Sequence, residues 1–150
     1  MPSPLYSRNI LLAEDDDDDC LIFRYALEEL SLAFNLTTVK NGEELMLLLN
    51  DDNARLPDVV FLDINMPRKN GFECLLEIKN NKRLETLPVI IFSTSFFLPL
   101  VERLYADGAH YYVRKPNEVG QLQKAIYEVL SLTAQPGCPQ PSLKEFVLTF

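Results

Sequence analysis

The sequence predicts an α/β fold in which a parallel β-sheet carries helices on both of its faces. Short apolar runs, of the kind found in strands buried on both sides, alternate with segments whose apolar residues follow helical spacing. This alternation occurs five times, and no internal repeat or low-complexity tract interrupts it. Parallel strands joined by crossover helices are the arrangement that such a pattern favours.

The five predicted strands each contain a short apolar stretch that ends at polar or turn-forming residues. In chain order they cover residues 10–13, 36–39, 59–62, 89–92 and 109–113. The third is the clearest, because its stretch is entirely apolar and Pro57 and Asp58 lead into it. Asn41 and Gly42 give a turn signal after the second strand. These runs predict strands that helices cover on both sides.

Apolar residues at helical spacing follow each strand and predict five helices. The residues that carry this spacing are Leu21, Ile22, Tyr25, Ala26 and Leu30, then Leu45, Leu48 and Leu49, then Phe72, Leu75, Leu76 and Ile78, then Leu100, Val101, Leu104 and Tyr105, and finally Val119, Leu122, Ile126, Val129 and Leu130. Aspartates suit the N-terminal turn of the first helix, and Gly108 is well placed to cap the fourth.

The length of 150 residues suits one compact domain. We expect residues 1–7 to be an N-terminal arm, residues 8–132 to form the domain, and residues 133–150 to be a linker and tail. The prolines and glycine between Gln135 and Pro141 cannot continue the fifth helix. Residues 142–150 are apolar enough to dock on a surface, but they are too few to form an output domain such as a helix-turn-helix.

The charge balance excludes some classes of partner. Acidic residues outnumber basic ones by 22 to 14, which gives a net charge of -8. A phosphate backbone or an anionic membrane would repel such a chain, so we expect neither nucleic acid nor membrane as a partner. No apolar run approaches the roughly 20 residues of a membrane-spanning helix. The three cysteines are far apart and lack metal-binding spacing, which favours a reduced, cytoplasmic setting.

Polar residues follow four of the predicted strands at their carboxyl ends, where open α/β sheets bind ligands. They are Glu14, Asp15 and Asp16 after the first strand, Asp63 and Asn65 after the third, Ser93 and Thr94 after the fourth, and Lys115 and Pro116 after the fifth. Each of these alone is more often a turn or capping residue. Their joint placement on one rim of the sheet favours a functional site.

The chemistry of this rim indicates phosphoryl transfer. Crowded carboxylates repel one another unless a cation neutralises them, and oxygen ligands suit Mg²⁺. Asp63 is a candidate nucleophile, because a carboxylate can attack phosphorus and form an acyl phosphate. Lys115 is placed to balance the anionic product, and Ser93 is placed to hydrogen-bond a phosphoryl oxygen.

Four segments carry a resemblance to a known family. Residues 10–16, residues 59–67 with Asn70 and Gly71, residues 88–94 and residues 108–116 together resemble a response-regulator receiver domain, over residues 8–132. The resemblance implies a flavodoxin-like, doubly wound sheet of five parallel strands in the order 2-1-3-4-5. It also implies a signalling domain whose only enzyme-like chemistry is its own phosphorylation and dephosphorylation.

The resemblance assigns a role to each residue of the rim. Asp63 would accept a phosphoryl group from a phosphohistidine of a sensor histidine kinase. Asp15 would bind Mg²⁺ directly and Glu14 through water, while Asp63 and the backbone carbonyl of Asn65 would complete the protein's ligands. Asp16 to Asp19 match no required position, and we expect Asp17 to Asp19 to remain a solvated helix start.

The resemblance also implies a switch. Ser93 matches the hydroxyl that moves toward the acyl phosphate, and Tyr112 matches the aromatic residue whose rotamer reports activation. Lys115 matches the lysine that contacts a phosphoryl oxygen, and Pro116 matches a proline that often follows a cis peptide bond. The face of the fourth helix, fifth strand and fifth helix would then change its state.

The implied partners are proteins. Because the sequence contains no DNA-binding domain, we expect its output to run through protein contacts, with a homodimer through the face of the fourth helix, fifth strand and fifth helix as one form. Residues 80–87 form a slightly long connection that is similar to single-domain regulators of phytochrome-type kinases. The cognate kinase and the downstream target do not follow from the sequence.

Three other interpretations of the same residues make different demands on the sequence. A haloacid-dehalogenase-like phosphatase needs a second acid two residues after the nucleophile, where this chain has Asn65. A flavodoxin-like cofactor binder needs a first loop that cradles phosphate, which Glu14 to Asp19 would repel. A receiver fold used as a docking or dimerisation module without phosphorylation has all the same residues and stays open.

Overall fold

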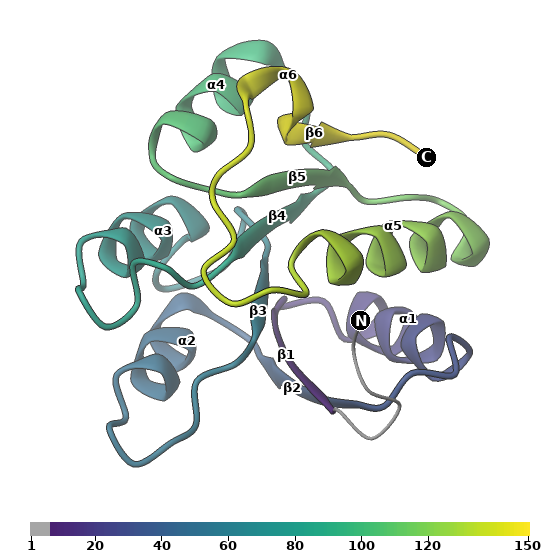
Figure 1. The fold of residues 1–150 in the computed structure, drawn as a ribbon, viewed down its shortest axis with the longest axis horizontal. Coiled ribbons are helices and arrows are strands. Elements are labelled where there is room, and N and C mark those ends of the chain that lie inside the picture. The colour runs from purple at the N-terminus through teal and green to yellow at the C-terminus, as the bar shows by residue number, and fades with distance from the viewer. Residues whose placement is uncertain (1–6) are drawn as a thin grey trace.

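A computed structural model describes residues 7–150. It contains one sheet of six parallel strands in the order β2-β1-β3-β4-β5-β6 (Figure 1). The strands are β1 (Arg8–Ala13), β2 (Phe34–Val39), β3 (Val59–Leu62), β4 (Val89–Ser93), β5 (Tyr111–Arg114) and β6 (Val147–Leu148). The first five confirm the predicted strand order, and β6 adds a strand beyond β5. The predicted arm, residues 1–7, lies outside the described residues except for Ser7.

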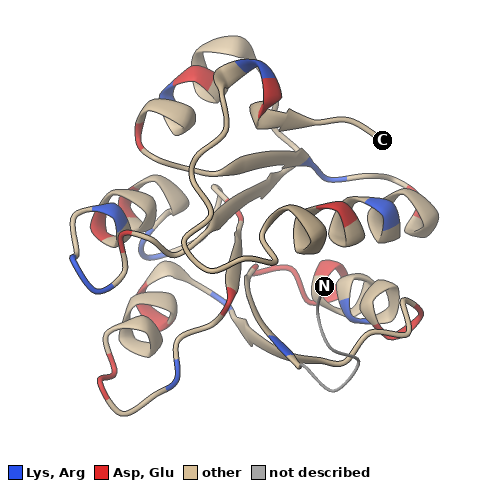
Figure 2. Cartoon of the chain, viewed as in Figure 1, with Lys and Arg blue, Asp and Glu red and all other residues tan. Residues whose placement is uncertain are grey.

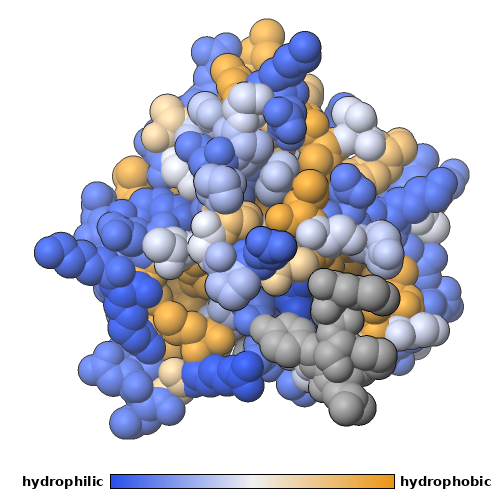
Figure 3. Space-filling view, viewed as in Figure 1, coloured by the Kyte–Doolittle hydropathy of each residue, from blue (hydrophilic) through white to orange (hydrophobic). Residues whose placement is uncertain are grey.

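Helices cover both faces of the sheet, as predicted (Figure 1). One face carries α1 (Asp17–Glu28) and α5 (Val119–Leu132), whose apolar residues share a buried cluster. The other carries α2 (Gly42–Leu49), α3 (Gly71–Lys79) and α4 (Leu98–Ala106), which share a second cluster. Figure 3 shows mainly hydrophilic residues on the visible surface, with smaller apolar patches between them.

Alternation along β1 explains why its sequence is apolar throughout. Leu11 and Ala13 point into the cluster formed with α2, α3 and α4. Ile10 and Leu12 point into the cluster formed with α1 and α5. Successive side chains of a strand face opposite sides, so a strand covered on both sides needs an apolar residue at every position.

Polar side chains fix where three helices begin. The Asp16 carboxylate accepts a hydrogen bond from the Asp19 backbone N–H at 3.0 Å, which caps α1. Asn41 caps α2 in the same way, and Asn70 caps α3 in a capping box with Glu73. These caps satisfy backbone donors that a helix start leaves without partners.

The end of α4 corrects one predicted strand boundary. Gly108 follows α4 with a φ of +104°, a conformation that favours glycine, and Asp107 is the capping residue. The Ala109 N–H then bonds to the Leu104 carbonyl at 3.1 Å. This bond ties Ala109 to the helix end, so β5 begins at Tyr111 and not at the predicted residue 109.

The C-terminal segment, residues 138–148, packs on the edge formed by α4 and β5 (Figure 1). It contains the short helix α6 (Leu143–Phe146), and β6 pairs with β5 through Tyr112 opposite Val147. Phe146 is fully buried, and its ring centroid lies 5.2 Å from that of Tyr105 and 6.3 Å from that of Tyr112. The apolar end of the chain therefore docks on its own domain.

Hydrogen bonds hold the same segment before α6. The Tyr105 hydroxyl donates to the Pro141 carbonyl at 2.7 Å, and the Gln140 side-chain amide donates to the Ala109 carbonyl at 2.8 Å. His110 Nε2 lies 3.1 Å from the Cys138 carbonyl oxygen.

Within residues 7–150, no helix has both the length and the apolar character that crossing a bilayer requires.

Candidate functional site

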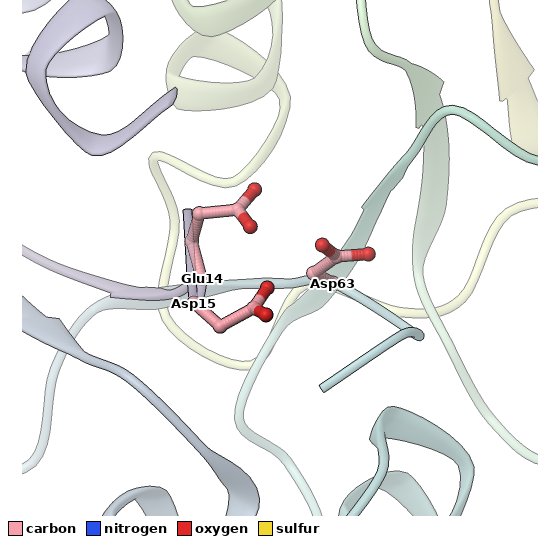
Figure 4. A group of neighbouring side chains, drawn as sticks. All are labelled: Glu14, Asp15 and Asp63. Carbon is pink, nitrogen blue, oxygen red and sulfur yellow. The ribbon is translucent and has the colours of Figure 1, made fainter. Parts of the chain in front are cut away.

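Three carboxylates meet where β1 and β3 end side by side. Glu14 and Asp15 follow β1, and Asp63 follows β3. The Asp63 N–H bonds to the Ala13 carbonyl at 3.1 Å, which fixes the two strand ends against each other. One oxygen from each of Glu14, Asp15 and Asp63 lies within 4.8 Å of the others, and their side chains converge in Figure 4. We call these three residues the carboxylate cluster.

The cluster is asymmetric in its exposure to water. Glu14 and Asp63 retain only 1% and 5% of their accessible surface, while Asp15 is exposed. Burial raises the pKa of Glu14 to about 7, Lys115 opposes this, and the charge of Asp63 raises it further. Burial thus favours the protonated form of Glu14, and extra positive charge in the pocket would favour its ionised form.

Lys115 reaches the cluster from the end of β5. Its backbone N–H bonds to the Ser93 carbonyl at 2.9 Å, which joins the ends of β4 and β5. Its ammonium forms an ion pair with Glu14 and lies 3.2 Å from an Asp63 oxygen. Burial lowers the pKa of Lys115, but the hydrogen bond to Glu14 and the charge of Asp63 outweigh that effect and raise it. The ammonium is therefore charged across the physiological range.

Asp19 also contacts Lys115, and this corrects an expectation. Its carboxylate lies 3.1 Å from the Lys115 Nζ, so it is not part of a merely solvated helix start. Asp18 does remain exposed, and exposed Asp17 pairs with Lys40. Figure 2 shows the acidic connection from β1 into α1. Asp19 lies three residues after Asp16, the residue that caps α1. This spacing is the only sequence feature that could have indicated that Asp19 faces the strand ends.

Ser93 and Tyr112 are linked through Ser95, which lies in the connection between β4 and α4. Ser93 is fully buried, and its Oγ accepts a hydrogen bond from the Ser95 N–H at 3.2 Å. The Tyr112 hydroxyl donates to the Ser95 carbonyl. The Tyr112 ring lies 5.6 Å from the Phe96 ring on one side and contacts Phe146 on the other. A contact path thus runs from Ser93 to the C-terminal segment.

Asn65 and Pro116 complete the predicted set. The Asn65 backbone N–H donates to an Asp63 carboxylate oxygen at 3.2 Å, and its side chain is exposed. The role of its carbonyl as a metal ligand stays a prediction. No peptide bond within residues 7–150 is cis, so the expected cis bond before Pro116 is wrong.

The carboxylate cluster fits a divalent cation. Its donors are all carboxylate oxygens, as Mg²⁺ prefers, and one of them is exposed to solvent that can supply water ligands. The raised pKa of Glu14 reflects burial together with the neighbouring charge of Asp63, and a cation would relieve that repulsion. Glu14, Asp15 and Asp63 are the residues that would hold it.

The chain is also similar to known proteins. The family profile of the response regulator receiver domain matches residues 10–127. The chain is 29% identical to the probable methanogenesis regulatory protein FilR2 of Methanothrix harundinacea over 123 residues, covering 80% of this chain and 79% of FilR2. It is also 29% identical to response regulator Rcp1 of Synechocystis over 126 residues, covering 81% and 86%.

Solved structures give the same result. The phosphorylated cyanobacterial phytochrome response regulator RcpA superposes with a TM-score of 0.78 at 29% identity, over 87% of this chain and 96% of RcpA. The Mn²⁺-bound form of Rcp1 superposes with a TM-score of 0.75 at 29% identity, over 83% and 92%.

Proposed function

This chain belongs to the response regulator receiver domain family, and on that basis we propose that Asp63 accepts a phosphoryl group from a phosphohistidine of a sensor histidine kinase. The observation that carries the proposal is the position of Asp63. Its buried carboxylate lies 3.2 Å from the Lys115 ammonium and beside the two acids at the end of β1. That arrangement supplies a nucleophile, a fixed cation and an oxygen-rich cation site in one pocket.

The residues of the pocket divide the chemistry between them. An Asp63 carboxylate oxygen attacks phosphorus, the new P–O bond forms, and the P–N bond breaks with its electron pair remaining on the histidine ring. Lys115 holds positive charge beside the Asp63 oxygen and offsets the charge of the transferred group. Mg²⁺ bound at the carboxylate cluster would neutralise further charge on the phosphoryl oxygens. The protein's role is to position and neutralise, as expected for phosphoryl transfer.

Signalling then rests on the path through Ser93. The phosphoryl group brings additional negative charge and acceptor oxygens to the pocket, toward which the Ser93 hydroxyl turns. Turning breaks the 3.2 Å contact with the Ser95 N–H, and Ser95 in turn holds the Tyr112 hydroxyl. The result is a shift of population between two packings of α4, β5 and α5.

The proposed partners are proteins in the cytoplasm. The similarity to RcpA, a phytochrome response regulator, supports a phytochrome-type sensor kinase as the phosphodonor. Output runs through protein contacts, including a homodimer through the face of α4, β5 and α5. The C-terminal segment lies on the β5 edge of that face, so a dimer would form through α4, α5 and the segment itself.

Intact mass spectrometry tests the proposal. The full chain is incubated with Mg²⁺ and acetyl phosphate, and we expect one phosphoryl adduct that is absent from Asp63→Asn. Asp52→Asn removes the same charge at an exposed site outside the pocket and should be modified like the wild type. An adduct that persists in Asp63→Asn contradicts the assignment of Asp63. No adduct in the wild type, with acetyl phosphate or any kinase, favours the unphosphorylated docking module.

A further inference from the structure

The environment of Lys115 raises a problem for cation binding. Its ammonium contacts Glu14 and Asp63, which are two of the three members of the carboxylate cluster. A divalent cation at the cluster would share the same two carboxylates with the Lys115 ammonium. Two positive charges bound to the same carboxylates lie close together and repel each other strongly. Lys115 must therefore move off at least one of them when the cation binds. Its side chain is only 11% exposed, so retreat into water is restricted.

Asp19 offers the displaced ammonium another partner. Among residues 7–150, it is the one carboxylate in contact with Lys115 that does not belong to the carboxylate cluster. Its backbone is fixed in the first turn of α1, where the Asp16 side chain accepts a hydrogen bond from the Asp19 N–H. Its side chain is 38% exposed, so it faces Lys115 from the rim of the pocket and not from within the cluster.

From this geometry we infer that Asp19 is a positioning residue. It retains the Lys115 ammonium at the edge of the pocket while a divalent cation occupies the carboxylate cluster. The inference rests on the proposed function in one respect, the cation site, and adds a residue that the expected ligand set omits.

Calorimetric titration with Mg²⁺ tests this without any phosphorylation step. We expect Asp19→Asn to weaken Mg²⁺ binding about fivefold to tenfold, because Lys115 loses its alternative partner and competes harder for Glu14 and Asp63. Asp18→Asn removes the same charge from the neighbouring, exposed position and should weaken binding by no more than about twofold. Asp19→Glu restores the charge and should recover most of the affinity.

A double-mutant cycle separates positioning from the general field of the charge. If Asp19 acts through Lys115, then in a Lys115→Met background Asp19→Asn should change Mg²⁺ affinity no more than Asp18→Asn does. Circular dichroism melts of every variant show whether each one is folded. A loss of affinity that is equally large with and without Lys115, or equal for Asp18→Asn and Asp19→Asn, overturns the inference.

The outcome is separable from that of the proposed function. Wild-type binding of Mg²⁺ with no effect of Asp19→Asn removes the positioning role and leaves phosphorylation of Asp63 unaffected. If the double-mutant cycle gives the expected coupling between Asp19 and Lys115 but the chain never forms a phosphoryl adduct, the proposed function is removed and the positioning role remains. If the wild type binds no Mg²⁺, the inference is overturned, because Asp19 then has no cation site to serve.

Discussion

At the scale of single residues, one buried titratable group has acidic partners and another has none among the groups that shift its pKa. Lys115 is enclosed by three carboxylates, which hold its ammonium charged despite burial. His110 is almost as enclosed, with 5% of its surface accessible, but its ring faces a carbonyl oxygen of Cys138 and no acid is among the groups that shift its pKa. The two residues therefore respond to pH in opposite ways.

Acid should destabilise the protein through His110. Burial lowers the pKa of His110 from 6.5 to about 4, the Lys79 charge lowers it further, and the Cys138 carbonyl opposes both. The unfolded chain then binds a proton that the folded chain excludes, so the free energy of unfolding falls as the pH falls from 6.5 toward 4. The loss is roughly 3 kcal/mol if the full shift is realised.

Urea denaturation of wild type and His110→Gln at several pH values between 7 and 4 measures this loss. The variant should show a shallower decline across that window, because glutamine does not titrate. Other groups, including Glu14, contribute equally to both proteins, and the difference between the two curves isolates His110. Parallel curves for the two proteins would contradict the assignment.

At the scale of elements, the C-terminal segment packs into the core of the domain through Phe146. Tyr105 of α4 and Tyr112 of β5 form the wall against which Phe146 packs. Neither α6 nor β6 follows from the sequence pattern, because a helix of four residues and a strand of two are too short to show a period. Their burial comes from the neighbouring α4 and β5 and not from their own propensity.

Phe146→Ala should therefore destabilise the whole domain. Removing a fully buried phenylalanine costs about 3–5 kcal/mol, through lost burial and the cavity that remains. Phe150→Ala is the matched control, because Phe150 is 42% exposed and should cost less than about 1 kcal/mol. Urea midpoints measured for both variants give the comparison, and equal midpoints would show that the segment is not docked in solution.

At the scale of the whole molecule, the parallel sheet and the residues at its strand ends were the features that the sequence allowed us to predict. The parallel sheet was accessible because strands covered on both faces need apolar runs, whereas the strand order was implied only by the family resemblance. The site was accessible because parallel strands bring their carboxyl ends to one rim. Glu14, Asp63 and Lys115 meet as predicted. Asp19 was missed, since its direction depends on the rotation of α1 after Asp16, and charge patterning alone contains no such information.

Mg²⁺ should stabilise the folded chain as a whole, because the carboxylate cluster is assembled only when β1 and β3 are paired. At a concentration of about 100 times Kd the gain is about 2.7 kcal/mol, which raises Tm by roughly 5–10 °C for a domain of this size. Thermal melts with and without Mg²⁺ measure it. Asp15→Asn should lose most of the shift, Asp52→Asn should keep it, and EDTA should reverse it.

The sixth strand also changes what a binding experiment on this protein measures. A partner that adds an extended segment to β5 meets an edge that is already paired, through Val147 and Leu148. The resident strand is covalently attached, and a short tether of this kind corresponds to an effective concentration in the millimolar range. An incoming strand must outcompete that local concentration, so its apparent affinity for the full chain is lower than its affinity for the bare β5 edge.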